Sequence, residues 1–248
     1  MTEHEGLNRS LENYVNAAGT LASICQSVTG VPLPETTLTH FKQTMHTIRL
    51  IDQKLDLTPD RDQRATFSSQ IMEYLKNKPV SFNDTPQLEK SLDAFRSVST
   101  SLPEKEEQSM LRTFDTIFKV TEEIRHTTNV KKLRFLTRLE GQLTSRLFLA
   151  LIPSEYKESE KYPKVIKALT RMGRVANSYD SFVDLPSDYR AHEVAVKPTL
   201  RNRVRLLVNA PTDIYELFSA APPTPTFLRQ ISSGVKLTNA NPARKEKL

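Results

Sequence analysis

The sequence contains few of the residue types that stabilise small or strand-rich folds. It has a single cysteine, Cys25, which excludes an intrachain disulfide framework and which we interpret as a small core side chain. It has no tryptophan and only 6 glycines in 248 residues. Leucine, lysine, glutamate, arginine and glutamine are abundant instead. This composition favours helices over sheets.

Long apolar stretches are also missing. The longest run, residues 147–152, is far shorter than the roughly 20 residues that a membrane-spanning helix needs. The first ten residues lack a basic segment followed by an apolar one, so we predict no signal peptide and a cytoplasmic protein. The net charge of +6 favours an anionic substrate or a membrane surface, so peripheral membrane association is a further expectation.

Apolar residues recur at helical spacing through most of the chain. Prolines, glycines and capping residues divide this pattern into segments. The helices predicted from these signals span approximately residues 7–29, 36–58, 61–77, 104–124, 130–152, 162–185, 198–209 and 212–219. A further helix is predicted to begin at about residue 85 and to continue through Phe95. We therefore predict a single all-α domain, a helical bundle, over residues 1–219. A stretch rich in Pro, Thr, Ser and Asn predicts a flexible basic tail over residues 220–248.

One acidic pattern occurs twice. Each copy has three aspartates spaced four residues apart, with a proline shortly after the second. The copies consist of Asp52, Asp56 and Asp60, and of Asp180, Asp184 and Asp188. Residues four apart share one side of a helix. We expect the first two carboxylates of each copy to lie together near a helix C-terminus, where the backbone dipole disfavours them.

Asp52 occupies a position that the apolar periodicity of its helix assigns to the inward side. A carboxylate there needs a cation, a donor or water. In the second copy, Asn177 precedes Asp180 by nearly one turn and shares its side of the helix. Oxygen ligands without nearby His or Cys suit Mg²⁺ or Mn²⁺, and Mg²⁺ completes its shell with water and substrate phosphates. The pattern predicts a diphosphate held through metal ions.

At these residues the chain resembles the squalene/phytoene synthase group of class I isoprenoid, or terpene, synthases. Those proteins carry two aspartate motifs of this form on helices that face each other across a central cavity. The segments RLEGQLTSRLFLALIP and KALTRMGRVANSYDSFVDLPSDYR also follow the order of the family. The resemblance covers about residues 36–205. Two departures are Gln53 after Asp52, where the family often has a second acid, and AHEVAVKP, where it usually has a glycine-bearing turn.

The resemblance implies an isoprenoid-synthase-like fold, in which the helical bundle surrounds a central cavity, and a set of site residues. Asp52, Asp56, Asp180 and Asp184 would be the catalytic and metal-binding carboxylates, and Asp188 a further metal ligand. Candidates for binding the diphosphate are Asn177, Arg138 and Arg174.

We therefore expect a Mg²⁺-dependent synthase, a transferase or lyase that ionises an allylic prenyl diphosphate. A divergent member that has lost catalysis is also compatible with the departures. Because a single D-x3-D on a helix is usually a solvated surface, a non-catalytic helical adaptor is the alternative. A third hypothesis, nucleic-acid association through Arg201–Arg205 and the tail, is disfavoured by the modest charge and the 7 % aromatic content.

Overall fold

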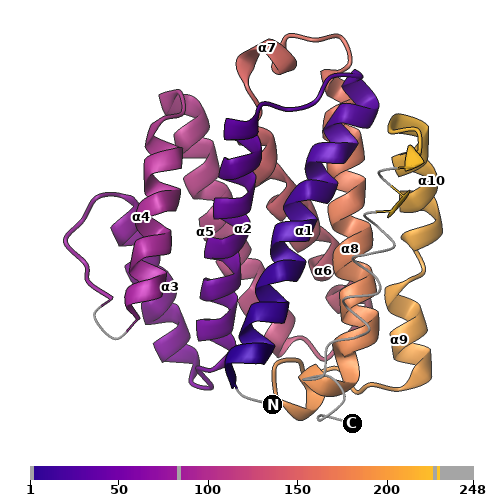
Figure 1. Ribbon diagram of the computed structural model, residues 1–248. Helices are drawn as coiled ribbons and strands as arrows, with labels where there is room; N and C mark the ends of the chain where they lie inside the picture. Colours follow the sequence, from indigo (N-terminus) through magenta and orange to yellow (C-terminus); the bar gives the residue numbers. More distant parts are fainter. Residues whose placement is uncertain (1–2, 83–84, 226–227, 230–248) are drawn as a thin grey trace.

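The computed structural model describes residues 3–82, 85–225 and 228–229, with side chains from Asn16 onward (Figure 1). Over these residues the protein is all-α, as predicted, and contains no strand. Its helices are α1 (Glu3–Thr29), α2 (Glu35–Asp56), α3 (Arg61–Leu75), α4 (Pro86–Thr100), α5 (Glu104–His126), α6 (Val130–Ala150), α7 (Ser154–Lys157), α8 (Tyr162–Arg190), α9 (Leu200–Leu206) and α10 (Ala210–Ala220).

Local signals explain where several helices begin. Asp60 caps α3, because its carboxylate accepts a hydrogen bond from the Gln63 amide at 2.8 Å. The Asn129 side chain caps α6 in the same way, and α4 begins at Pro86, which needs no backbone donor in the first turn. The third aspartate of the first acidic copy therefore stabilises a helix start.

The predicted end of the helix over residues 162–185 is wrong, because α8 continues through Pro186 to Arg190. Proline has no N–H, so the Phe182 carbonyl loses its normal helical donor. Arg203 on α9 supplies a replacement: its Nε donates to this carbonyl oxygen at 3.0 Å, and its guanidinium lies 4.7 Å from the centre of the Phe182 ring. A tertiary contact thus satisfies the acceptor that the proline leaves.

Two central helices, α6 and α8, pack at very short range. A Cβ atom added at Gly141 on α6 would lie 2.2 Å from the carbonyl oxygen of Gly173 on α8. One turn away, the Ser145 hydroxyl donates to the Leu169 carbonyl oxygen across the same contact at 2.8 Å. Only glycine allows this approach, because any side chain would overlap the opposite backbone.

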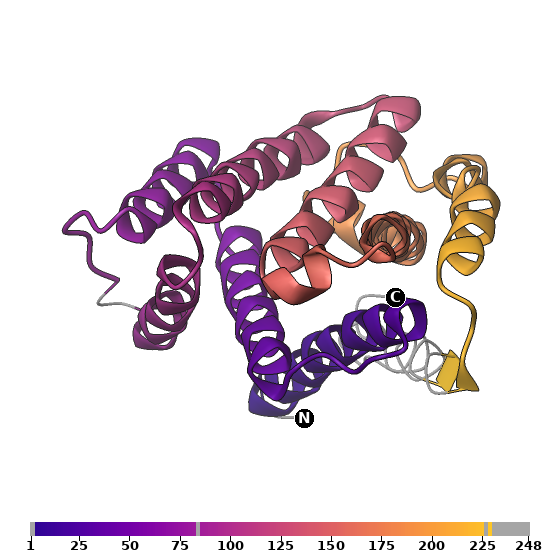
Figure 2. The same ribbon diagram turned by 90° about the horizontal axis from the view of Figure 1, so that it is seen from above.

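Helices α1, α2, α5, α9 and α10 lie around this pair, and α3 and α4 lie farther out, beyond α2 and α5 (Figure 2). Helix α5 packs on α6, α10 packs on α8, and α1 contacts both α2 and α8, while α4 contacts α2 and α5. The largest core cluster draws on α1 to α6, α8 and α10 and includes Cys25, as predicted. Between α2 and α6 it contains Phe41 and Phe148, whose ring centroids lie 5.1 Å apart. Aromatic packing therefore fills this part of the bundle.

The predicted tail, residues 220–248, starts inside the packed structure. Ala220 and Ala221 are buried, and the Ser27 hydroxyl on α1 donates to the Pro222 carbonyl oxygen at 2.5 Å. Residues 230–248 lie outside the described residues. The boundary between domain and tail remains a prediction.

Candidate functional site

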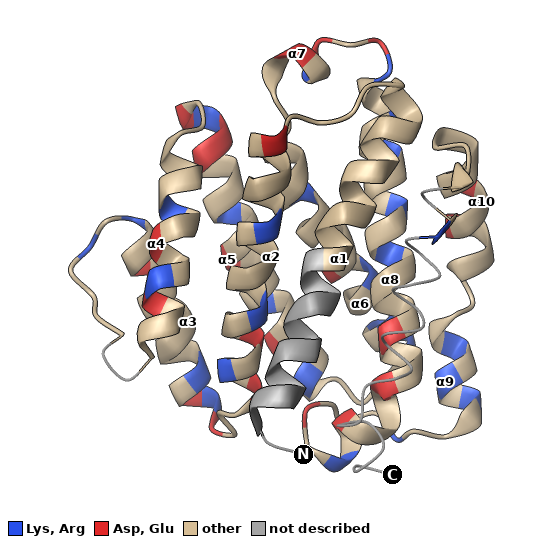
Figure 3. Ribbon diagram, viewed as in Figure 1, with Lys and Arg blue, Asp and Glu red and all other residues tan. Residues whose placement is uncertain are grey.

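The two aspartate pairs lie at the same end of the bundle. Helices α2 and α8 run in the same direction, and α1 packs against both of them (Figure 1). Asp52 and Asp56 occupy the last two turns of α2, and Asp180 and Asp184 occupy the C-terminal half of α8. Figure 3 shows acidic residues on this lower part of α8. The arrangement brings segments that are distant in the sequence to one end of the bundle.

The prediction that Asp180 and Asp184 lie close to a helix end is wrong. Because α8 does not stop before Pro186, Asp184 is followed by six further helical residues and Asp188 is the aspartate in the last turn. The dipole effect fades beyond the last turn of a helix. It therefore acts on Asp56, the final residue of α2, and on Asp188, but much less on Asp180 and Asp184.

Asp56 forms an ion pair with Arg125 on α5, at 2.6 Å from Oδ1 to Nη2. The Arg125 side chain is only 9 % exposed, so its charge is largely removed from water and depends on this carboxylate. Sequence reasoning did not identify Arg125. A basic residue in the last turn of a helix is ordinary, because it favours the helix dipole, and nothing in the local pattern links it to Asp56.

A second carboxylate, Glu140 on α6, joins three helices near this ion pair. It accepts hydrogen bonds from the Thr121 hydroxyl on α5 at 2.6 Å and from the Asn177 amide on α8 at 3.1 Å. Burial raises the pKa of Glu140, and the two hydrogen bonds and the Arg125 charge oppose this rise. Asn177, predicted to bind diphosphate, is therefore engaged with a carboxylate of α6.

Helix geometry relates Asp52 to this network. Helices α2 and α5 run in the same direction (Figure 1), and Asp56 meets Arg125. One turn earlier on each helix are Asp52 and Thr121, which therefore lie at a similar level along the bundle. Thr121 is the donor to Glu140. Asp52 therefore lies at about the same height along the bundle axis as the hydrogen-bonded group of Thr121, Glu140 and Asn177.

The other two predicted diphosphate ligands lie elsewhere. Arg138 on α6 binds the Asp213 carboxylate of α10 through Nε and Nη2, at 3.0 and 2.8 Å. Arg171 on α8 contacts the same carboxylate at 2.9 Å, and Arg174 approaches it to 3.9 Å. Asp213 is only 1 % exposed. The structure brings Arg138 and Arg174 together, but around a buried acid that sequence reasoning missed.

Arg174 is the least neutralised of these three cations. Burial lowers its pKa, and the nearby charges of Arg171 and Arg138 lower it further. Its closest partner is the side-chain oxygen of Gln142 on α6. Arg174 and Asp180 are six residues apart on α8, which places them on different sides of the helix. The arginine cluster is therefore a separate feature from the aspartate pairs.

The four aspartates could hold a metal ion only at a site with one or two protein ligands. Within the described residues, no group of three or more His, Cys, Asp or Glu side chains is arranged to hold a metal ion. Mg²⁺ accepts one or two carboxylates when water and substrate phosphates complete its shell. Asp180, which is exposed, and Asp184 lie one turn apart on α8, a spacing that would allow this mode. The pair on α2 fits it only if Asp56 exchanges its ion pair with Arg125 for a metal.

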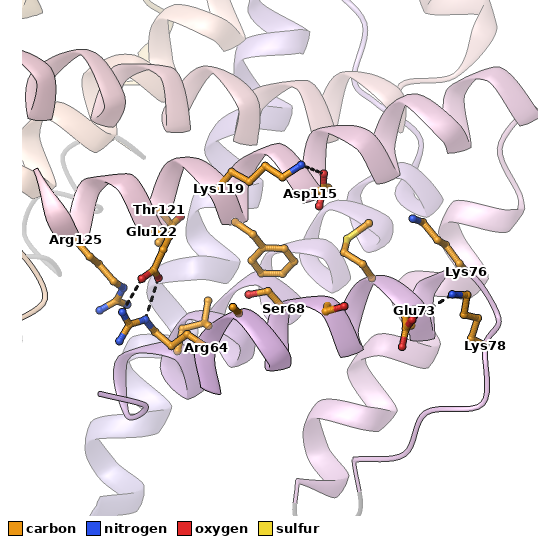
Figure 4. A pocket seen from close by; sticks show the side chains of 15 residues that line it. Arg64, Ser68, Glu73, Lys76, Lys78, Asp115, Lys119, Thr121, Glu122 and Arg125 are labelled. Carbon is orange, nitrogen blue, oxygen red and sulfur yellow. Dashed lines mark hydrogen bonds and ion pairs between the residues drawn. The ribbon is translucent and has the colours of Figure 1, made fainter. Parts of the chain in front are cut away.

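A groove with a volume of about 450 Å³ separates α3 from α5 (Figure 4). Residues at helical spacing on each helix form its walls, and Leu55, Met72 and Phe118 provide apolar surface. Arg64 and Glu122 close one end: the guanidinium donates to both carboxylate oxygens, at 2.7 and 3.0 Å. The basic residues that line it are Arg64, Lys76, Lys78, Lys119 and Arg125.

A second hollow of about 440 Å³ shares Lys119 and Glu122 with this groove. Neither hollow is lined by Asp52, Asp56, Asp180 or Asp184. The aspartates themselves therefore lie outside both hollows, although Arg125, the ion-pair partner of Asp56, lines the first of them.

Comparison of the chain with protein-family models, with curated proteins and with solved structures finds no match.

Proposed function

We propose that the protein binds the diphosphate group of a prenyl diphosphate at the end of the bundle that carries the aspartate pairs of α2 and α8, through Mg²⁺ or Mn²⁺, and that it is a synthase that ionises this substrate. The proposal includes an isoprenoid-synthase-like fold, as the resemblance to squalene/phytoene synthases implies. The observation that carries it is the common position of the two aspartate pairs, at one end of the bundle on helices that both contact α1.

In this proposal each aspartate pair provides the metal-binding oxygens, with Asp188 as a further ligand on α8. When bound, the metal would stabilise the negative charge of the departing diphosphate. Arg125 is the cation that contacts the first pair, so it takes the donor role that the sequence had assigned to Arg138 and Arg174. Asn177 orients the site through Glu140, to which it is hydrogen-bonded.

A thermal-shift experiment tests the binding step. Inorganic diphosphate together with Mg²⁺ is expected to raise the melting temperature, because a ligand that binds only the folded state stabilises it. Asp52→Asn and Asp180→Asn should each abolish the rise. Asp115→Asn is the matched control, because it removes an equal charge from an exposed pair with Lys119 that contributes little to stability.

Product analysis after incubation with farnesyl or geranylgeranyl diphosphate tests the reaction itself. Release of diphosphate by the wild type, and its loss in Asp180→Asn, is the expected result. A wild-type protein whose melting temperature does not respond to Mg²⁺ and diphosphate would refute the proposal. A protein that binds diphosphate but releases none from either substrate would retain the site without the activity.

The groove between α3 and α5 favours a second candidate, a non-catalytic helical adaptor. The groove combines apolar surface with five basic and three acidic side chains, which suits an amphipathic segment of a partner protein that carries charges of both signs. Ser69→Trp, which would fill the groove, should then abolish binding of such a segment.

A further inference from the structure

Exposed apolar side chains concentrate on α9, α10 and the turn that joins them. Among the described residues, five of the ten exposed large hydrophobic side chains lie in this short segment: Leu200, Val204, Val208, Ile214 and Tyr215. Leu200 is 72 % exposed and Tyr215 is 75 % exposed. Single exposed hydrophobic residues are common, but a cluster of them marks an interaction surface.

Leu200, Val204 and Val208 recur every four residues and therefore follow one side of α9 and its continuation. The opposite side of α9 is anchored to the protein. Leu206 is buried in a small cluster with residues of α6 and α8, and Arg203 binds the Phe182 carbonyl. The exposed stripe is thus held outward by contacts on the other side of the helix.

The stripe has a basic border. Arg201 and Arg205 each follow a stripe residue by one position, and the Lys197 side chain just before α9 is exposed. The sequence has no Asp or Glu between Glu193 and Asp213. Asp213 is buried among arginines of α6 and α8. In Figure 3, α9 carries basic residues and no acidic ones.

Helices α9 and α10 lie on the outer side of α8, at the edge of the bundle (Figures 1 and 2). Neither of the two hollows described above is lined by residues of these helices. The surface is an apolar strip with cations along its border, and it lies outside both of these hollows.

We propose that the outer surface of α9 and α10 docks onto an anionic lipid bilayer. The aliphatic side chains and Tyr215 would enter the headgroup region, while Lys197, Arg201 and Arg205 would bind lipid phosphates and carboxylates. A second copy of the chain fits poorly, because a two-fold contact through this surface would bring the basic borders together. The attachment is peripheral: no helix in the described part of the chain has the length and apolar content to cross a bilayer.

This inference is independent of the proposed diphosphate site, because the two use different surfaces. Co-sedimentation of the full chain with vesicles of equal parts phosphatidylcholine and phosphatidylserine tests it. The wild type is expected to bind these vesicles much more strongly than vesicles of phosphatidylcholine alone. Loss of both charges in Arg201→Gln/Arg205→Gln should weaken binding about 25-fold, since each basic residue near such a surface contributes about fivefold. Val204→Ser/Val208→Ser should weaken it about tenfold.

Lys90→Gln/Lys105→Gln is the matched control, because it removes two exposed charges from α4 and α5. It should bind anionic vesicles as the wild type does. Equal binding by the Arg201/Arg205 and control variants would overturn the proposal, because another part of the chain would then attach to lipid. Two further outcomes would also overturn it: a concentration-dependent dimer that Val204→Ser/Val208→Ser abolishes, or arginine-dependent binding to duplex oligonucleotides without binding to vesicles. Circular dichroism would confirm that the variants are folded.

Discussion

Arg203 donates a hydrogen bond to the Phe182 carbonyl oxygen, the acceptor that Pro186 leaves without a helical donor. In a regular helix, the N–H of residue 186 would bind the carbonyl of residue 182. The guanidinium of Arg203 also lies over the Phe182 ring. The contact ties α9, which carries the proposed lipid-binding surface, to the C-terminal part of α8, which carries the second aspartate pair.

The first prediction is that Arg203 and Pro186 are energetically coupled. Arg203→Gln should lower the free energy of unfolding by about 1–3 kcal/mol, because it removes a charged hydrogen-bond donor from a backbone acceptor. In a Pro186→Ala background the loss should be about 1 kcal/mol smaller, since the N–H of the new alanine can donate to the Phe182 carbonyl. Urea unfolding of the four proteins measures this coupling. Equal losses in both backgrounds would contradict it.

The second prediction concerns the close contact of α6 and α8. Gly141→Ala should lower the free energy of unfolding by about 3 kcal/mol or more, because the new Cβ atom would overlap the Gly173 carbonyl. Gly173→Ala should have a similar effect. Ser145→Ala, at the same contact, removes one hydrogen bond without adding volume and should reduce stability by only about 1 kcal/mol. Similar melting temperatures for all three variants would show that the helices can separate at little cost.

The third prediction concerns the buried acid of α10. Asp213→Asn should lower the free energy of unfolding by about 3–5 kcal/mol, because Arg138 and Arg171 would lose their shared counter-charge. Glu216→Gln is the matched control. Glu216 also binds Arg171, at 2.6 Å, but it is 26 % exposed, so its loss should cost less than about 1 kcal/mol. Chemical denaturation of both variants measures the difference, and the buried-acid interpretation requires the larger loss for Asp213→Asn.

The fourth prediction concerns stability in acid. Hydrogen bonds from Arg64 lower the pKa of Glu122 from 4.5 to about 2, against the opposing effect of burial. The folded protein therefore keeps this carboxylate ionised while the unfolded chain takes up a proton. The stabilisation is complete above pH 4.5 and is lost as the pH falls toward about 2.

Glu122→Gln tests this dependence. It should reduce the free energy of unfolding by roughly 2–3 kcal/mol at neutral pH. The difference from the wild type should shrink as the pH is lowered from 4.5 toward 2, because the wild type then loses the same interaction. Denaturant titrations at a series of pH values provide the measurement. A constant difference at every pH would rule out the ionised pair as its source.

The fifth prediction concerns Glu140. Burial raises the pKa of Glu140 in the folded protein. The free energy of unfolding therefore falls as the pH rises from the unfolded-state pKa through the higher folded-state pKa. Glu140→Gln removes the charge and keeps hydrogen-bonding groups for Thr121 and Asn177, so it should raise the free energy of unfolding at neutral pH by about 1 kcal/mol. Glu123→Gln, from an exposed pair with Lys132, should change stability little. A destabilised Glu140→Gln protein would show that the network requires the negative charge.

Much of the secondary structure could be predicted because its determinants are local. Pro86 stands at the start of α4, and the Asn129 side chain caps α6. Predicted and observed helices otherwise differ mainly by a few residues at their ends, where fraying and short turns blur any boundary. The short helix α7 was missed, since four residues carry no detectable periodicity.

Pairings between distant residues could not be predicted. Asp213 lies in the first turn of α10, where an acidic residue is common because it interacts favourably with the helix dipole. The residues around it in the sequence therefore do not indicate that it contacts three arginines on other helices. The same applies to Arg125 and Asp56, which are 69 residues apart. Pro186 predicted a helix end because proline lacks the backbone N–H that a helix uses. The helix continues instead, and Arg203 of α9 donates to the Phe182 carbonyl that the proline leaves without a donor.

Local patterns in the amino-acid sequence were enough to specify that this chain forms helices, roughly where they start, and that two aspartate pairs recur in it, because periodicity, caps and composition act over a few residues. The three-dimensional structure was needed to show which charged side chains form pairs, which glycines are in contact and which apolar side chains remain exposed. Those outcomes depend on how whole helices pack, and packing joins residues whose separation along the chain carries no signal of their contact.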